Sequence, residues 1–294
     1  MKKLTTDRKF VYSSVIPIAI IVVLIGFLPI FYSFNLSLKD FSLIERSSKY
    51  IGFANYISLL TDSRYIHALV FTLVFALAAT VIEVIFGFIL AHVLADKSVS
   101  SRFSSAMRTL MMIPYIVAPV AVSYTYKSLV YDPNSGYLNY FLTLFHLPRF
   151  IIFDGKVNAI IAVLIMEVIL RTPFITLILY AGISAIPDSI LEASEIDGAG
   201  VMQRIFKVVI PYIRPVLVVA FIFRFMDAIK MFDEIYVLTK GGPGYITENV
   251  SVYASAQSFE FFHTAYAAAS TFIFFIVVMI IINIFLKVSK FGTD

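Results

Sequence analysis

The segment IPDSILEASEIDGAGVMQRIFKVVIPYIRP, residues 186–215, decides how the chain is interpreted, because it is polar while long apolar runs lie on both sides of it. We predict two short helices that meet at a bend. Asp188 or Ser189 follows a proline and can cap the first helix. Gly198 can take the left-handed backbone conformation that ends this helix.

The second helix of this segment is predicted from the spacing of its apolar residues. Val201, Ile205 and either Val208 or Val209 would share one face, as in an amphipathic helix. Pro211, followed by a second proline at the end of the segment, closes it. A polar helix pair between long apolar runs indicates a docking surface.

The composition excludes an ordinary soluble domain. Of the 294 residues 60% are hydrophobic and 14% charged, whereas soluble domains are about half apolar and a quarter charged. The mean hydropathy of +0.91 agrees. The absence of Cys excludes a disulfide scaffold and thiolate chemistry. We attribute the net charge of +4 to basic cytoplasmic loops and expect no nucleic-acid partner, since no basic tract with interleaved aromatics occurs.

The apolar runs predict an all-α membrane protein with six transmembrane helices in a single domain over residues 1–294. Each run exceeds the roughly 20 residues that a helix needs to cross ~30 Å of hydrocarbon. The first run is too long for a signal peptide and lacks a small-residue cleavage site, so we predict an uncleaved span. The predicted spans are 11–34, 67–95, 106–130, 157–184, 215–238 and 264–286.

The distribution of basic residues places both termini in the cytoplasm. Eight Lys and Arg residues fall on the opposite side and three fall inside predicted spans. The twelve on the side of the termini are Lys2, Lys3, Arg8, Lys9, Lys97, Arg102, Arg108, Arg204, Lys207, Arg214, Lys287 and Lys290.

Two apolar stretches are too short to span a membrane. Phe53–Leu60 and Tyr137–Leu147 suit helices that lie in the membrane interface. Glycine and proline clusters at residues 132–136 and 240–244 predict turns. Pro173 predicts a kink in the fourth span.

Several ionisable residues fall inside predicted spans, where they usually face a cavity or a partner. Glu167 and Arg171 are four positions apart and can pair on one helix face. The second span contains Glu83. The fifth span contains a predicted charged stripe along one helix face, formed by Arg224, Asp227, Lys230, Asp233 and Glu234.

These charges have two interpretations. They can line a polar path through the membrane, or they can form ion pairs that lock helices to each other or to a partner subunit. We favour ion pairs for Glu83, Arg224 and Asp227, and both interpretations stay open for Arg171 and Lys230.

Motifs for catalysis are missing from the sequence. No G-x-x-x-x-G-K-[ST] nucleotide loop occurs, and the four His show no metal-ligand spacing. We therefore predict that the chain is not an enzyme and carries no metal and no cofactor of its own.

The polar segment resembles the coupling loop of binding-protein-dependent ABC importer permeases. The pattern of that loop is EAA, three residues, G, nine residues and I-x-L-P. The departures here are Ser for the second Ala, Val for Ile and Ile for Leu, all of which keep the character of the residue. The matching positions are Glu192, Ala193, Ser194, Asp197, Gly198, Ala199, Val208, Ile210 and Pro211.

Further stretches resemble the carbohydrate branch of this family, the maltose-permease F-type subunits. They cover most of the chain, although the extra spans and large outer domain of the maltose protein are missing. The matching stretches are Gly52-Phe53, Asn55-Tyr56, Phe71-Thr72, Arg171–Phe174, Ala181–Ile183, Ile186-Pro187, Phe232-Asp233, Leu238-Thr239, Gly241–Pro243, Thr247 and Ala267–Ser270.

The resemblance implies a type I ABC importer permease fold in a bacterial cell membrane, with a cytoplasmic coupling helix. It implies that Glu192 contacts an ATPase ionically, that small Ala193 and Ser194 allow close approach, and that Gly198 permits the bend. The implied candidates for the substrate path are Arg171, Phe174, Lys230, Met231 and Asp233.

The implied function is that of a permease subunit in an ATP-driven importer of di- or oligosaccharides. The implied partners are a second homologous permease, two ATP-binding cassette subunits that bind the ATP, an extracytoplasmic sugar-binding protein and the lipid bilayer. The alternatives are a permease for another polar solute such as glycerol phosphate, an ion-coupled secondary carrier, which usually shows internal repeats, or a structural membrane scaffold.

Overall fold

The computed structural model describes residues 8–42, 44 and 48–288. Lys2, Lys3 and Lys290, three of the basic residues counted on the side of the termini, lie outside the described residues. The described chain is mostly helical and divides into two compact units. The first unit comprises residues up to 65 together with 253–277, and the second comprises 66–252 together with the residues from 278 onward.

The first unit holds α1 (Arg8–Ser37), a short hairpin of β1 (Lys39–Phe41) and β2 (Ser48–Tyr50), and α2 (Ala54–Thr61). The antiparallel strands pair Lys39 with Tyr50. Asn55 ties α2 to the chain before it, because its side-chain amide donates to the carbonyls of Ser37 and Lys39 at 2.8 and 2.9 Å. The unit also contains the end of α13 (Val250–Ser255), the π-helical turn η3 (Ala256–Glu260) and the first part of α14 (Thr264–Val288).

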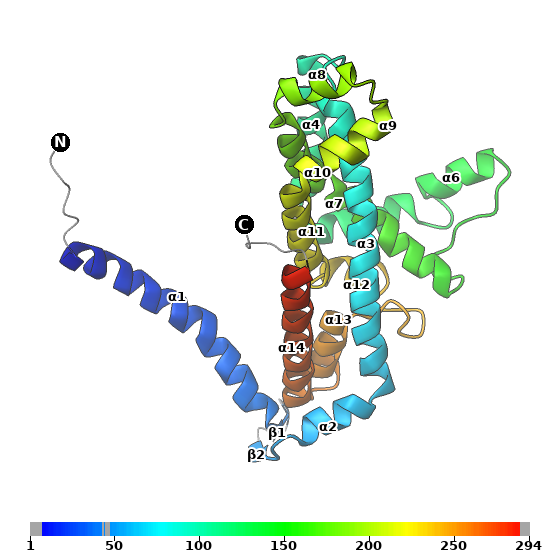
Figure 1. Cartoon of the computed structure of the whole chain (residues 1–294). Coiled ribbons are helices and arrows are strands. Elements are labelled where there is room, and N and C mark those ends of the chain that lie inside the picture. The colour runs from blue at the N-terminus through cyan, green and yellow to red at the C-terminus, as the bar shows by residue number, and fades with distance from the viewer. Residues whose placement is uncertain (1–7, 43, 45–47, 289–294) are drawn as a thin grey trace. The chain divides into compact units, whose positions relative to one another are not determined.

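The second unit is built around three long helices. These are α3 (Ser63–Ala95), which enters it from the first unit, α7 (Lys156–Ser184) and α11 (Arg214–Ala228). Around them lie α4 (Ser101–Ile116), α5 (Pro119–Thr125), the π-helical turn η1 (Tyr126–Val130), α6 (Tyr137–Leu144) and α12 (Asp233–Leu238). The segment 186–215 forms α8 (Asp188–Ile196), α9 (Val201–Arg204), the π-helical turn η2 (Ile205–Val209) and α10 (Ile210–Tyr212), at one end of the unit (Figure 1).

One glycine marks a close contact between two of these helices. A Cβ atom on Gly87 of α3 would lie 2.7 Å from a side-chain methyl of Ile175 in α7, so only glycine fits without a shift. Small residues permit such contacts between helices that have little hydrophobic driving force in a bilayer. Two apolar clusters fill the unit, one around Met166 and Ile235 and one around Leu179 and Val209.

The all-α membrane fold is confirmed. Within the described residues, four helices are long and apolar enough to cross a membrane, and two bent helix pairs raise the number to six if each pair forms one span. The predicted helices in the stretches 53–60 and 137–147 correspond to α2 and α6. The prediction of one permease domain over 1–294 stays a prediction.

Two predicted spans differ from the structure. The third span, predicted over 106–130, is a pair of helices with a 93° bend before Pro119. The fifth span, predicted over 215–238, ends as α11 at Ala228, and α12 starts only at Asp233. Pro173, by contrast, lies inside α7, which continues without interruption on both sides of it.

Candidate functional site

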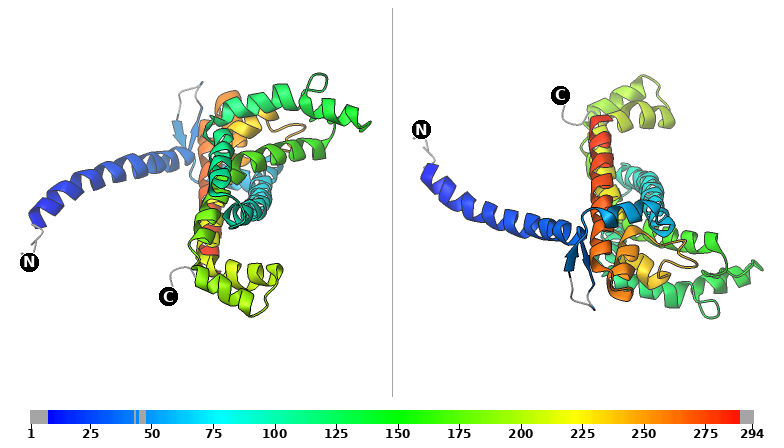
Figure 2. Two further views of the ribbon diagram at one scale, coloured as in Figure 1. Left: turned by 90° about the horizontal axis from the view of Figure 1, so that it is seen from above. Right: turned by 90° about the horizontal axis from the view of Figure 1, so that it is seen from below.

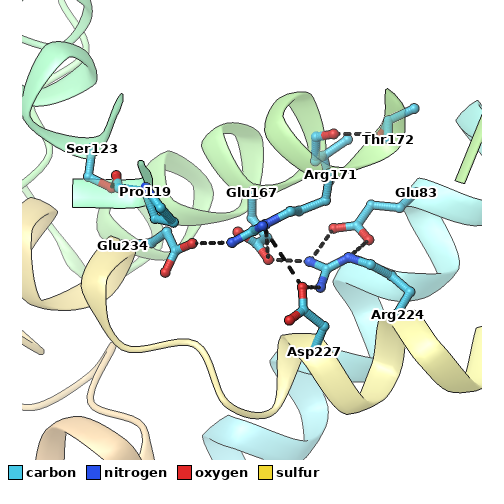
Figure 3. Close-up of polar contacts among 10 residues, drawn as sticks. Glu83, Pro119, Ser123, Glu167, Arg171, Thr172, Arg224, Asp227 and Glu234 are labelled. Atoms are coloured by element: carbon cyan, nitrogen blue, oxygen red, sulfur yellow. Dashed lines mark hydrogen bonds and ion pairs between the residues drawn. The ribbon is translucent and has the colours of Figure 1, made fainter. Parts of the chain in front are cut away.

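Six charged side chains from four helices meet inside the second unit (Figure 3). We call this group the ion cluster. Its members are Glu83 of α3, Glu167 and Arg171 of α7, Arg224 and Asp227 of α11, and Glu234 of α12.

Arg224 lies at the centre of the ion cluster, with 1% of its side chain exposed. Its guanidinium binds Glu83 through two bonds, Nε to Oε2 at 2.5 Å and Nη2 to Oε1 at 3.0 Å. Nη2 also donates to Glu167, and Nη1 donates to Asp227 Oδ2 at 3.1 Å. Arg224 thus joins α11 to α3 and α7, which confirms the ion-pair interpretation for Glu83, Arg224 and Asp227.

Arg171 connects α7 to α12. Its Nη2 donates to Glu234 Oε1 at 2.6 Å. The predicted ion pair between Arg171 and Glu167 is confirmed. Its distance of 3.8 Å from Nε to Oε1 is longer than that of the bond to Glu234. Nη1 lies 3.9 Å from Asp227 Oδ2. Sequence reasoning missed the contact with Glu234, which lies 63 positions away along the chain.

The ion cluster lies where two helices are interrupted. The bend before Pro119 separates α4 from α5, because proline has no N–H to continue the helical bonding. Residues 229–232 separate α11 from α12, and α12 packs against α5. In a membrane such irregular backbone is tolerated where it is buried in protein or lines water. The two breaks and the ion cluster therefore mark a polar region.

The predicted charged stripe along one face of the fifth span is wrong, because the helix is interrupted at residues 229–232 and the five residues lie on two helices and the break between them. Arg224 and Glu234 are buried, Asp233 is half-buried and Lys230 is exposed. Met231 is buried in the apolar core together with Ile235.

An aromatic pair adjoins Arg171. The rings of Tyr115 and Phe174 stack with centroids 5.4 Å apart and an angle of 7° between their planes. The guanidinium carbon of Arg171 lies 5.8 Å from the centroid of the Tyr115 ring, a cation–π geometry. The structure thus brings together two of the predicted path residues, Arg171 and Phe174, and adds Tyr115, which sequence reasoning did not single out.

The first helix of the polar segment ends as predicted and begins differently. Gly198 has a φ of +77°. The N–H groups of Gly198 and Ala199 donate to the carbonyls of Glu195 and Ser194, both at 3.0 Å, which is the pattern of a Schellman cap. At the start, Pro187 takes the cap position and no side chain caps the helix. Asp188 instead pairs with Lys97 at 2.8 Å.

The residues that match the EAA pattern divide between two faces of α8. Glu192, Ala193, Asp197 and Gly198 are exposed. Ser194 is buried, and its hydroxyl donates to the Leu191 carbonyl at 2.6 Å. The exposed residues are accessible to a partner, while Ser194 faces the interior of the unit.

The second helix of the polar segment differs from the prediction of a regular amphipathic helix. The π-helical turn η2 shifts the register of the side chains, so Val209 is buried while Val201 is 57% exposed. The predicted common face of Val201, Ile205 and Val208 or Val209 does not form. Pro211 lies in α10 and is exposed.

A pocket of about 440 Å³ lies between the polar segment and the ends of α3 and α7. Its polar lining includes His92, Asp96, Lys97, Glu192 and Arg204. The hydrogen bond with Asp188 raises the pKa of Lys97, and hydrogen bonds from Ser98 lower the pKa of Asp96. Figure 2 shows the segment (yellow-green) from two further sides.

Comparison with protein families adds the deciding observation. Residues 83–290 match the family described as the binding-protein-dependent transport system inner membrane component. The chain belongs to this family. The matched range contains the ion cluster and the whole polar segment, so this permease chain is a transporter component of a membrane.

The permease chain is similar over nearly its whole length to curated sugar permeases. It is 30% identical over 292 residues to the trehalose/maltose transport system permease protein MalF of Thermococcus litoralis, covering 98% of this chain and 96% of that one. It is 33% identical over 282 residues to the trehalose transport system permease protein SugA of Mycobacterium tuberculosis, covering 96% and 89%.

Solved structures confirm the permease fold. A bacterial alginate ABC transporter, crystallised with an alginate pentasaccharide-bound periplasmic protein, contains a chain with a TM-score of 0.83 at 19% identity. The match covers 98% of both chains. The identity is low, so the likeness concerns the fold.

Proposed function

We propose that the permease chain is one of two transmembrane subunits of an ATP-driven ABC importer for di- or oligosaccharides. It would form half of the translocation path and couple this path to ATPases in the cytoplasm. Membership of the family carries the transporter part of this proposal. The sugar part is supported by relatives that are named for trehalose, maltose and multiple sugars.

The geometry of α8 supports a coupling role for the polar segment. Glu192 presents an exposed carboxylate that can contact a basic residue of an ATPase, and the adjacent Ala193 is small enough for close approach. Exposed Asp197 and Gly198 form the turn at the end of the helix, and Pro211 lies in α10 near the end of the segment. A force on this rigid segment would reach α3 and α7, whose ends line the pocket beneath it.

The proposed partners are those of a binding-protein-dependent importer. They are a second homologous permease, two ATP-binding cassette subunits that bind the ATP, an extracytoplasmic sugar-binding protein and the bilayer. Both termini and the segment 186–215 would face the cytoplasm, because the ATPases lie there.

The proposed substrate path runs beside the ion cluster. Arg171 and Phe174 offer hydrogen-bonding and aromatic groups to a sugar, and Lys230 is exposed to solvent in the isolated chain. Asp233 is half-buried at the start of α12, and Met231 would reach the path only after a rearrangement, since it is buried.

The rival functions are less well supported. A phosphate-bearing solute would need free Arg and Lys side chains, whereas Arg171 and Arg224 are both bound to carboxylates. The family match argues against an ion-coupled secondary carrier and a structural scaffold.

Substitution at the bend tests the coupling role. Gly198→Asp places a side chain at a φ of +77°, which costs a non-glycine residue about 1–2 kcal/mol and deforms the end of α8. We expect ATP-dependent uptake of radiolabelled maltose or trehalose to be abolished, while immunoblots of membranes detect the protein at its normal level.

Gly200→Asp is the matched control, because Gly200 has a φ of −67°, no atom lies within 4 Å of a Cβ built there, and Asp is favourable at a helix N-cap. It should transport normally. Normal uptake by Gly198→Asp would count against the coupling role.

A further inference from the structure

The ion cluster contains more carboxylates than arginines. Its four acids face two guanidinium groups, so an excess of two negative charges remains when all of them are ionised. Lys230 and Asp233 belong to the same stretch of chain and add one charge of each sign, which leaves the excess unchanged.

Neither arginine is free to receive an anion. Arg224 is buried and contacts three carboxylates. Both terminal nitrogens of Arg171 face carboxylates, those of Asp227 and Glu234. A negatively charged solute would therefore have to displace an existing ion pair.

Two buried atoms of the ion cluster lack hydrogen-bond partners. They are Glu167 Oε2, which can only accept while ionised, and Arg171 Nε, which can only donate. Buried polar atoms without a partner are unfavourable, so a polar group that reaches them, from water or from a solute, is stabilising. A sugar hydroxyl can donate to the first atom and accept from the second, whereas a carboxylate can only accept.

The accessible edge of the ion cluster is acidic and has an aromatic side. The side chain of Asp227 is 53% exposed, compared with 1% for that of Glu167 and 3% for that of Glu234. Stacked Tyr115 and Phe174 give a flat apolar surface next to Arg171, on which the C–H face of a sugar ring can lie.

We infer that the ion cluster, with Tyr115, forms a subsite that takes neutral or cationic saccharides and rejects acidic ones, and that Asp227 is its specificity-determining residue. This inference rests on the proposed function, because it places the subsite on the translocation path. An anionic sugar beside Asp227 meets an exposed carboxylate and the excess negative charge of the ion cluster, while an ammonium group or a hydroxyl meets an acceptor.

The test measures saccharide binding to the permease itself. The full chain is purified with its partner subunits in nanodiscs, without the sugar-binding protein, and studied by saturation-transfer NMR. The probes are maltose, a disaccharide of two glucosamines and digalacturonate. We expect wild type to bind the first two at least about tenfold more tightly than digalacturonate, a difference of about 1.4 kcal/mol.

Variants then test whether Asp227 causes the difference in affinity between neutral and acidic sugars. Asp227→Asn should reduce the difference in affinity between maltose and digalacturonate. Asp227→Ser should do the same if the first variant is unstable. Asp154→Asn, which removes an exposed acid from the loop before α7, is the matched control and should keep the gap.

Equal binding of digalacturonate and maltose in wild type, or an unchanged gap in both Asp227 variants, would overturn the inference and leave the proposed function standing. Absence of binding by all three sugars would also overturn it. The proposed function would fail as well only if ATP-dependent uptake of sugars were absent.

Discussion

Arg224 shows how one residue can hold several membrane helices together. It is the largest of the side chains with less than 2% exposure among the described residues, and it binds carboxylates from α3, α7 and α11. Burying a charge is tolerable only when it is paired and hydrogen-bonded. Arg224 therefore fixes where its partners lie, and its partners in turn depend on it.

Removal of Arg224 should destabilise the protein strongly. Arg224→Met leaves Glu83 and Glu167 buried and without their main counter-charge, and the loss of one partner from a buried ion pair costs about 3–5 kcal/mol. We expect a large fall in the melting temperature of the purified protein in detergent, together with a low yield from membranes.

The compensated variant separates charge from packing. Changing Glu83, Glu167 and Arg224 together to Met removes the charges as a group, which is often neutral for stability, so the triple variant should regain most of what the single one loses. A single Arg224→Met variant as stable as wild type would disprove the structural role.

At the scale of helices, the crossing of α3 and α7 is set by Gly87. Ala at this position would place its Cβ 2.7 Å from the Ile175 methyl and 3.3 Å from a backbone nitrogen of α7. We expect Gly87→Ala to lower stability by about 1–3 kcal/mol, the usual range for overpacking. Thermal unfolding followed by fluorescence-detected size exclusion would measure it.

Gly26→Ala in α1 is the control for this substitution. No atom lies within 4 Å of a Cβ built at Gly26, so the gain in helix propensity should leave this variant as stable as wild type or slightly more so. If both variants behaved alike, the close approach at Gly87 would have no energetic consequence.

The start of α3 depends on Asp62, which makes it sensitive to pH. Its Oδ1 accepts from the N–H groups of Arg64 and Tyr65, and its Oδ2 accepts from the hydroxyls of Tyr253 and Tyr266. Burial alone would raise the pKa of Asp62, but these hydrogen bonds outweigh it and hold the pKa below the ordinary value of 3.8.

The sign of the effect follows from that shift. A carboxyl whose pKa is lower in the folded state stabilises the fold above its unfolded pKa, and this stabilisation is lost as the pH falls through the folded value. Wild type should be more stable than Asp62→Asn from pH 7 to pH 5, and the difference should shrink below about pH 4. Melting curves across this pH range would detect the change, and a substitution of exposed Asp40, Asp40→Asn, is the control. A stability difference between wild type and Asp62→Asn that stayed constant with pH would contradict the prediction.

The sequence predicts those elements that local patterns determine. Long apolar runs give α1, α3, α7 and α14, and a glycine followed by the start of a second helix gives the end of α8. It fails at residues 229–232, because the break there accompanies contacts of Arg224 and Glu234 with side chains that lie 141 and 63 positions away in the sequence. The π-helical turn η2 was missed for the same kind of reason, since the spacing of the valines alone fits a regular helix.

The sequence likewise predicts one part of the candidate site and not the other. The coupling residues follow from a spaced motif within twenty positions, whereas Tyr115 and Asp227 gain their importance only from tertiary neighbours. Tyr115 is one of 17 tyrosines, and nothing in its local sequence separates it from the others until its ring is seen against Phe174 and Arg171.

For the whole molecule, the proposed function requires one orientation in the membrane. The ATPases bind ATP in the cytoplasm, so the segment 186–215 must face that side, and the turn at residues 132–136 must then face the opposite side. The excess of basic residues on the side of the termini favours the same orientation.

The absence of cysteine makes this orientation directly measurable, because any introduced thiol is unique in the chain. Ser189→Cys and Asn134→Cys place single thiols at exposed positions in α8 and in the outer turn. In intact cells with an accessible outer face, a membrane-impermeant maleimide should label position 134 and leave position 189 unlabelled until the membrane is permeabilised. Labelling of position 189 from outside would refute the coupling role of α8 and, with it, the proposed link between ATP hydrolysis and the movement of α3 and α7.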